Sequence, residues 1–244
     1  MTTFITGGTV VSATGRTQAD VLIDGEKIVA LVEPGSTALG SDLAGTADQV
    51  IDATGKYVIP GGVDAHTHME MPFGGTFASD TFETGTRAAA WGGTTTIIDF
   101  VVQKTGERVL DSLAAWHDKA NGQCAIDYGF HQIIGGVDDD SLKAMDELVT
   151  EGITSFKLFM AYPGVFYSDD GQILRAMQKA ADNGSMIMMH AENGIAIDVL
   201  VQQALERGET DPIYHGRTRP WETEEEATHR AIMLAKMTGA PLYI

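Results

Sequence analysis

Two histidines separated by a single residue form the first pattern in the sequence that could carry chemistry. His66 and His68 follow an apolar, glycine-rich stretch at 57–62, which reads YVIPGG. Side chains alternate between the two faces of a strand, so these imidazoles should point the same way. Neutral imidazole is the commonest protein ligand for transition metals. The pair therefore suggests a metal site, although a His-x-His pair on its own is a weak signal.

Further polar residues of interest occur inside apolar stretches. Lys157 lies within 154–160, where an ammonium group needs a partner, a neutral state or a modification, unless its head reaches water. His190 ends the apolar stretch 186–190 and could be a metal ligand or a hydrogen-bonded core residue. His131 is more consistent with a structural or ligand-supporting role. If these side chains surround one opening, a lysine that bears a carboxylate there could bridge two metal ions.

The elements that must position these residues alternate between strand and helix from residue 57 onward. Near-continuous apolar strands indicate a parallel sheet that is buried on both faces. Repeated strand-helix units predict a (β/α)8 barrel or a doubly wound sheet. The predicted strands are 58–65, 94–100, 125–134, 154–160, 185–190 and 241–244, and the predicted helices are 80–91, 108–121, 139–151, 170–183, 194–207 and 222–238.

The positions of the polar residues favour the barrel. His66, His68, Asp99, Lys157 and His190 lie at or near the carboxyl ends of four different strands. A barrel gathers such residues around one mouth, whereas an open sheet binds ligands at one switch point. No phosphate-binding glycine fingerprint follows the first strand. The prediction is an α/β chain whose residues 57–244 form part of a (β/α)8 TIM barrel, about the first five to six strands.

Residues 1–56 have a different pattern and are predicted to form a separate β module. Short apolar runs alternate with turns, and Asp24-Gly25 is a hairpin signal between two of them. The stretch 34–47 is rich in Gly, Ser, Thr and Ala and is predicted to be a loop.

Composition excludes several classes of protein. The 244 residues carry a formal charge of −18 with 16 Lys and Arg, which argues against a nucleic-acid partner. No apolar run approaches the roughly 20 residues that span a bilayer, so no membrane partner is expected. The single cysteine, Cys124, fits a reducing compartment. We expect a soluble, cytoplasmic protein.

Four stretches together resemble the dihydropyrimidinase and D-hydantoinase branch of the cyclic amidohydrolases. They read PGGVDAHTH at 60–68, GGTTT at 92–96, SFKLFMAY at 155–162 and HAENG at 190–194. Residues 1–56 resemble the N-terminal part of that family's β-sandwich. The resemblance implies a homotetramer with two divalent metal ions, usually zinc. It implies that His66 and His68 bind the inner ion, that an N6-carboxylated Lys157 bridges both, and that His190 binds the outer one.

The same resemblance implies hydrolysis of a cyclic amide bond. A hydroxide that bridges the metals would open a 5,6-dihydropyrimidine or hydantoin ring to give an N-carbamoyl amino acid. Tyr162 would join Lys157 in catalysis by hydrogen-bonding the substrate carbonyl and its oxyanion. The implied substrate contacts, besides Tyr162, are Met69, Met71, Phe73, Val165 and Phe166.

Three alternatives to this function remain open, namely an allantoinase, a dihydroorotase and a non-catalytic scaffold of the dihydropyrimidinase type. Dihydroorotases usually pair a substrate carboxylate with arginine, and none lies near the first-strand motif. The metal ligands retained here argue against a scaffold. The last four residues resemble a sixth strand, so the sequence predicts an incomplete barrel and a segment that is inactive alone.

Overall fold

The computed structural model describes residues 1–34, 45–104 and 106–244, which divide into two compact units, Met1–Gly61 and Gly62–Ile244. The predicted loop at 34–47 lies mostly outside the described residues. Among the helices that the structure does describe, none is long and apolar enough to cross a membrane.

The first unit consists of two small β-sheets. A four-stranded sheet has the order β5-β4-β1-β6, and a three-stranded sheet has the order β3-β2-β7. Asp24 and Gly25 form the turn between β4 and β5, where Gly25 has a φ of +59° that suits glycine. The strands are β1 (Thr2–Thr6), β2 (Thr9–Ser12), β3 (Gly15–Gln18), β4 (Asp20–Asp24), β5 (Lys27–Val32), β6 (Gln49–Asp52) and β7 (Tyr57–Val58).

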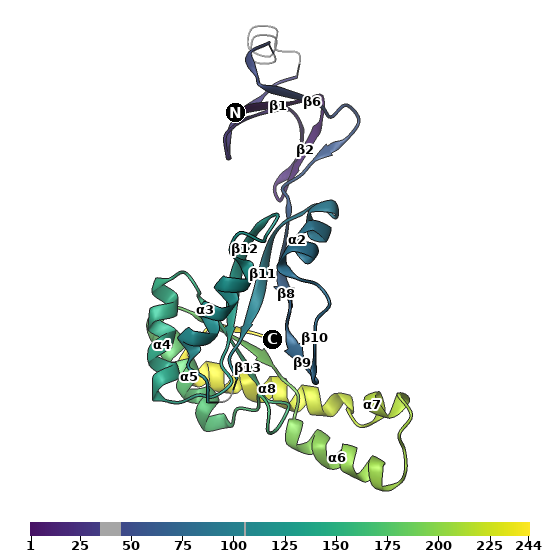
Figure 1. The fold of residues 1–244 in the computed structure, drawn as a ribbon, viewed down its shortest axis with the longest axis vertical. Coiled ribbons are helices and arrows are strands. Elements are labelled where there is room, and N and C mark those ends of the chain that lie inside the picture. Colours follow the sequence, from purple (N-terminus) through teal and green to yellow (C-terminus); the bar gives the residue numbers. More distant parts are fainter. Residues whose placement is uncertain (35–44, 105) are drawn as a thin grey trace. The chain divides into compact units, whose positions relative to one another are not determined.

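The second unit is built on a six-stranded parallel sheet with the order β15-β14-β13-β12-β11-β8. Each strand therefore lies beside the next strand of this sheet in the chain, as in a (β/α)8 barrel, and the curled sheet forms an open part of one (Figure 1). Within the described residues, β8 and β15 each pair on one side only. The strands are β8 (Gly62–Thr67), β11 (Thr94–Val102), β12 (Asp127–Ile133), β13 (Ser155–Phe159), β14 (Met186–His190) and β15 (Leu242–Tyr243).

Helices follow the strands and cover one face of this sheet. Figure 1 shows α3, α4 and α5 side by side along the sheet, and α8 packs against α5. Their bounds are α2 (Phe82–Trp91), α3 (Val109–Ala120), α4 (Asp139–Thr150), α5 (Asp170–Asn183), α6 (Gly194–Glu206), α7 (Ile213–Arg217) and α8 (Trp221–Thr238). The six predicted helices are confirmed. The five-residue α7 and the hairpin β9 (Pro72–Phe73) and β10 (Thr76–Phe77) were not predicted.

Local signals explain where several helices begin and end. Thr81 and Asp169 form capping boxes with Thr84 and Gln172, and these satisfy amide groups in the first turns of α2 and α5. Gly184 and Gly239 end α5 and α8 in the left-handed conformation. These ends return the chain to β14 and β15, which keeps the strand-helix units short.

The main core lies between the parallel sheet and its helices. Phe156 and Leu158 of β13 and Ile187 of β14 are fully buried, as are Met145 of α4 and Ile173 of α5. Each such side chain contributes about 1.5–3 kcal/mol through its removal from water. This packing fixes the strand ends on which the polar side chains sit.

Candidate metal and substrate site

The candidate ligands meet at the carboxyl ends of the parallel strands. His66 lies on β8, Lys157 on β13 and His190 at the end of β14. A cavity of about 190 Å³ is lined by His66, His68, Met71, Phe73, Phe100, Ile133, Lys157, Phe159, Tyr162, Phe166 and His190. The structure thus brings all four predicted ligands and Tyr162 to one cavity.

A larger cavity, of about 610 Å³, runs along the inner surface of the sheet from Asp64 to Tyr243. It touches His66 and His131, but its lining does not include His68, Lys157 or His190. The donor groups converge in the smaller cavity, which is therefore the better candidate for chemistry.

His66 and His68 form a close pair, as their spacing predicts. Their ring centroids are 5.1 Å apart, and both rings lie against Phe100, at 4.6 and 5.1 Å. Burial, together with the charge of Lys157, lowers the pKa of His66. Burial, then His66 and Lys157, lowers the pKa of His68 to about 4. Both imidazoles are therefore neutral near pH 7, which is the state that binds a metal.

Lys157 lies in an apolar setting without a counter-charge. Burial lowers its pKa, and its Nζ has no hydrogen-bond or ion-pair partner among the residues the structure describes. Nζ lies 6.0 Å from the ring centroid of Phe100 and 5.5 Å from that of Phe159. An isolated ammonium group is costly here, so the site favours a neutral or modified amine.

His190 lies on the other side of Lys157 from the histidine pair. Its ring stacks on Phe159 at 5.7 Å and lies 5.3 Å from the ring of Tyr162. Phe159 is also the ring nearest Lys157 Nζ, while Phe100 contacts Lys157, His66 and His68. Lys157 thus shares the neighbouring ring of Phe100 with the histidine pair and that of Phe159 with His190.

These donors do not form a closed metal site by themselves. Across the described part of the chain, no three His, Cys, Asp or Glu side chains cluster closely enough to hold a metal ion. His66, His68, Lys157 and His190 nevertheless line the same cavity. A bare lysine is a poor metal ligand at neutral pH, but a carboxylate on its nitrogen would supply the oxygen donors that divalent ions accept. On that condition the residues fit a metal site.

Asp99 anchors the segment that carries His68. This buried carboxylate of β11 accepts hydrogen bonds from Thr67 Oγ1 at 2.9 Å, Met69 N at 2.8 Å and Trp116 Nε1 at 3.2 Å. Burial raises the pKa of Asp99 to about 6, although these hydrogen bonds oppose the shift. Its position at a strand end was visible in the sequence, but its partners on β8 and α3 were not.

His131 links the strands that carry His66 and Lys157. Its Nε2 donates to the carbonyl of Ala65 at 3.0 Å, so its Nδ1 is free to accept from Ser155 Oγ at 2.5 Å. Burial lowers the pKa of His131, in keeping with a neutral ring. His131 does not line the smaller cavity and lies where a supporting role was predicted.

The predicted substrate contacts divide into two groups. Met71, Phe73 and Phe166 line the cavity, whereas Met69 and Val165 do not. Met69 is 9% exposed and packs so closely on α2 that a Cβ at Gly85 would lie 2.3 Å from its Sδ. Val165 is 55% exposed. The direction of each side chain within these short loops decides whether it lines the cavity, and the sequence does not reveal that direction.

Tyr162 has an unusual backbone that aims its ring at the cavity. Its φ is +59°, a left-handed conformation that costs a non-glycine residue about 1–2 kcal/mol. Its carbonyl accepts hydrogen bonds from Val165 N at 3.0 Å and Phe166 N at 3.1 Å, which hold this turn. Burial, and then the charge of Glu192, raises the pKa of Tyr162, so its hydroxyl keeps its proton at neutral pH.

Part of a curled β/α barrel with candidate metal ligands at its strand ends is an arrangement typical of barrel enzymes. Residues 57–216 match the model of the amidohydrolase family, and the chain belongs to that family.

Relatives and solved structures agree with this assignment. The chain is 66% identical to a D-hydantoinase of Streptomyces coelicolor over 242 residues, which cover 99% of this chain and 51% of that protein. It is 50% identical to a D-hydantoinase of Geobacillus stearothermophilus, covering 100% of this chain and 50% of that one. The crystal structure of dihydropyrimidinase from Brevibacillus agri matches with a TM-score of 0.93 at 49% identity, over 100% of this chain and 51% of that chain. The chain thus spans about half the length of the curated relatives it matches.

Proposed function

We propose that the protein that carries this chain hydrolyses the cyclic amide bond of hydantoins or 5,6-dihydropyrimidines to yield N-carbamoyl amino acids. The observation that carries the proposal is the meeting of His66, His68, Lys157, His190 and Tyr162 at one cavity. The names of the similar proteins, D-hydantoinase and dihydropyrimidinase, support this substrate class.

The proposed cofactor is a pair of divalent metal ions, with zinc the expected metal. His66 and His68 would hold one ion, His190 would hold the other, and Lys157, N6-carboxylated, would bridge them. Bound there, the ions would lower the pKa of water toward neutrality and polarise the amide carbonyl. The pKa of Lys157, lowered by burial, supports this modification, because a neutral amine is the form that adds to carbon dioxide.

The chain's own residues would orient the ring and stabilise developing charge. The Tyr162 hydroxyl, which keeps its proton, would donate to the carbonyl oxygen as negative charge forms there. Met71, Phe73 and Phe166 would supply an apolar wall for a substituent on the ring. Among the described residues that line this cavity none is an arginine, which favours uncharged rings over substrates with a carboxylate.

We further propose a homotetramer in the cytoplasm. The family resemblance supports the tetramer. The free Cys124 supports a reducing compartment, because exposed or half-buried thiols persist there.

Turnover of hydantoin and dihydrouracil by the full-length protein tests the proposed function. The N-carbamoyl product is quantified by chromatography before chelation, after chelation, and after zinc and bicarbonate are restored. We expect activity that chelation abolishes and that zinc with bicarbonate restores. Ring opening that survives complete metal removal would refute the proposed cofactor, and no ring opening of either substrate would refute the substrate class.

Residues 1–244 alone provide a second test. They are expected to show no turnover, because the relatives extend to about twice the length that this chain covers. Measurable turnover by the purified segment would contradict the prediction that it is inactive alone.

A further inference from the structure

Glu192 lies directly behind His190 and contacts one of its ring nitrogens. Glu192 Oε2 and His190 Nε2 are 2.6 Å apart, and the two side chains are 21% and 32% exposed. An ionised carboxylate can only accept a hydrogen bond, so the proton in this contact must sit on Nε2.

This contact determines where the imidazole can offer a lone pair. A neutral imidazole has one N–H group and one acceptor nitrogen. With the proton on Nε2, the acceptor is Nδ1, which has no hydrogen-bond partner among the residues described by the structure. His190 lines the cavity. Glu192 thus leaves one nitrogen, Nδ1, available to a metal.

The backbone that carries both residues is tied to the segment that follows β13. Met160 N donates to the carbonyl of His190, and Gly194 N donates to the carbonyl of Met160, each at 3.0 Å. A Cβ at Gly194 would lie 2.7 Å from Ala161 Cα, so only glycine permits this approach. The segment 190–194 is therefore fixed at both ends against the turn that holds Tyr162.

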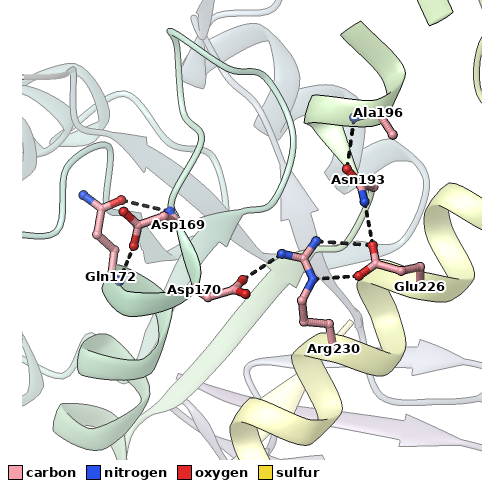
Figure 2. A network of polar contacts seen from close by, with 7 residues as sticks. All are labelled: Asp169, Asp170, Gln172, Asn193, Ala196, Glu226 and Arg230. Atoms are coloured by element: carbon pink, nitrogen blue, oxygen red, sulfur yellow. Dashed lines mark hydrogen bonds and ion pairs between the residues drawn. The ribbon is translucent and has the colours of Figure 1, made fainter. Parts of the chain in front are cut away.

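A polar network among α5, α6 and α8 also holds the segment 190–194 (Figure 2). Asn193 accepts from Ala196 N at 3.0 Å, which caps α6, and donates to Glu226 of α8 at 2.8 Å. Arg230 binds Glu226 at 2.8 Å and Asp170 of α5 at 2.7 Å. Helices α5, α6 and α8 thus hold Asn193, the residue next to Glu192. The carboxylate of Glu192 therefore stands on a rigid support.

We propose that Glu192 is a positioning residue that fixes the proton on His190 Nε2 and directs His190 Nδ1 into the cavity as a metal donor. The inference deepens the proposed function and rests on its metal site. Carboxylates that hydrogen-bond a metal-ligating histidine orient the ring and raise its basicity, and their loss typically weakens metal binding about 10–100-fold.

Zinc binding to the full-length protein tests this role. The metal-free wild type, Glu192→Gln and Glu192→Ala are titrated with Zn²⁺ against a chromophoric chelator, with Glu225→Gln as the matched control on exposed α8 surface. We expect Glu192→Ala to lose about 10–100-fold in affinity at the zinc that His190 would hold. Glu192→Gln should stay close to wild type, because its amide oxygen accepts the same hydrogen bond. Equal zinc affinity in Glu192→Ala and wild type would overturn the proposal.

Two structural readouts separate this inference from the proposed function. A crystal structure of the zinc-loaded protein should show Nδ1 of His190 on the metal and Nε2 on Glu192, and coordination through Nε2 would overturn the inference. If the wild type binds no zinc, the proposed metal site fails. Histidine ¹⁵N NMR of the metal-free protein then decides the tautomer. A proton on Nε2 that Glu192→Ala loses and Glu192→Gln keeps supports the inference, and an unchanged tautomer in Glu192→Ala overturns it.

Discussion

Asp99→Asn tests the buried carboxylate that anchors the segment carrying His68. Asp99 has no exposed surface, and burial raises its pKa from 3.8 to about 6. The folded chain therefore binds this proton more tightly than the unfolded chain does. The contribution of Asp99 to stability is fully present below pH 3.8 and is lost as pH rises through 6.

The size of the effect follows from that shift. One pKa unit corresponds to about 1.4 kcal/mol, so the whole titration removes about 3 kcal/mol of folding free energy, roughly half of it between pH 5 and pH 8. Asparagine does not ionise. The difference in unfolding free energy between Asp99→Asn and wild type should thus shift in favour of the variant by about 1.5 kcal/mol between pH 5 and pH 8.

A separate, pH-independent cost should accompany the substitution. Asp99 accepts hydrogen bonds from three donors, on both of its oxygens, whereas asparagine has one acceptor oxygen. Its amide group must face either Trp116 Nε1 or the Thr67 and Met69 donors, which costs about 1–3 kcal/mol at every pH.

Urea unfolding of the metal-free protein at a series of pH values measures both effects. Asp146→Asn serves as the control, because hydrogen bonds from Lys179 and Asn183 lower the pKa of Asp146 below 3.8. This carboxylate is then ionised in both the folded and the unfolded chain, so its variant should show no pH trend between pH 5 and pH 8. A wild-type-to-variant difference that is constant from pH 5 to pH 8, or that moves against Asp99→Asn, would refute this account of the buried carboxylate.

Three further predictions concern the site. Tyr162→Phe should lower kcat of the full-length protein for the proposed ring opening about 10²–10³-fold with zinc content unchanged, and an unaltered kcat would exclude the tyrosine from oxyanion stabilisation. Lys157→Arg keeps the positive charge but cannot carry the carboxylate, so metal analysis should show loss of the bridged zinc pair; two zinc ions per chain would contradict the bridging role. His131→Phe leaves the Ala65 carbonyl and the Ser155 hydroxyl without their hydrogen-bond partner, which should lower the free energy of unfolding in urea by about 2–4 kcal/mol. A decrease below about 1 kcal/mol would show that these bonds do not hold the β-strands together.

Local patterns in the sequence were sufficient to predict the architecture of the barrel part. The apolar strands and amphipathic helices from residue 57 onward recur as β8 and β11 to β15 with their helices, and their sequential order gives the partial barrel. The β9–β10 hairpin and α7 escaped prediction because elements of two to five residues carry too few side chains to show a period.

The chemistry of the site also begins in local sequence. The i, i+2 spacing of His66 and His68 places their rings together, and the apolar neighbours of Lys157 account for its lowered pKa. The residues that surround this centre could not be read in the same way, because Asp99 with Thr67 and His131 with Ala65 are 32 and 66 residues apart in the chain.

The amino-acid sequence by itself therefore predicted the candidate metal ligands and the strand ends on which they stand. Only the tertiary structure decided which groups support them from a distance, since Asp99 and His131 act through contacts that exist only when separate strands come together. It likewise decided that Met71 faces the cavity while Met69 packs into the core, because the direction of a side chain in a short loop depends on its packing partners.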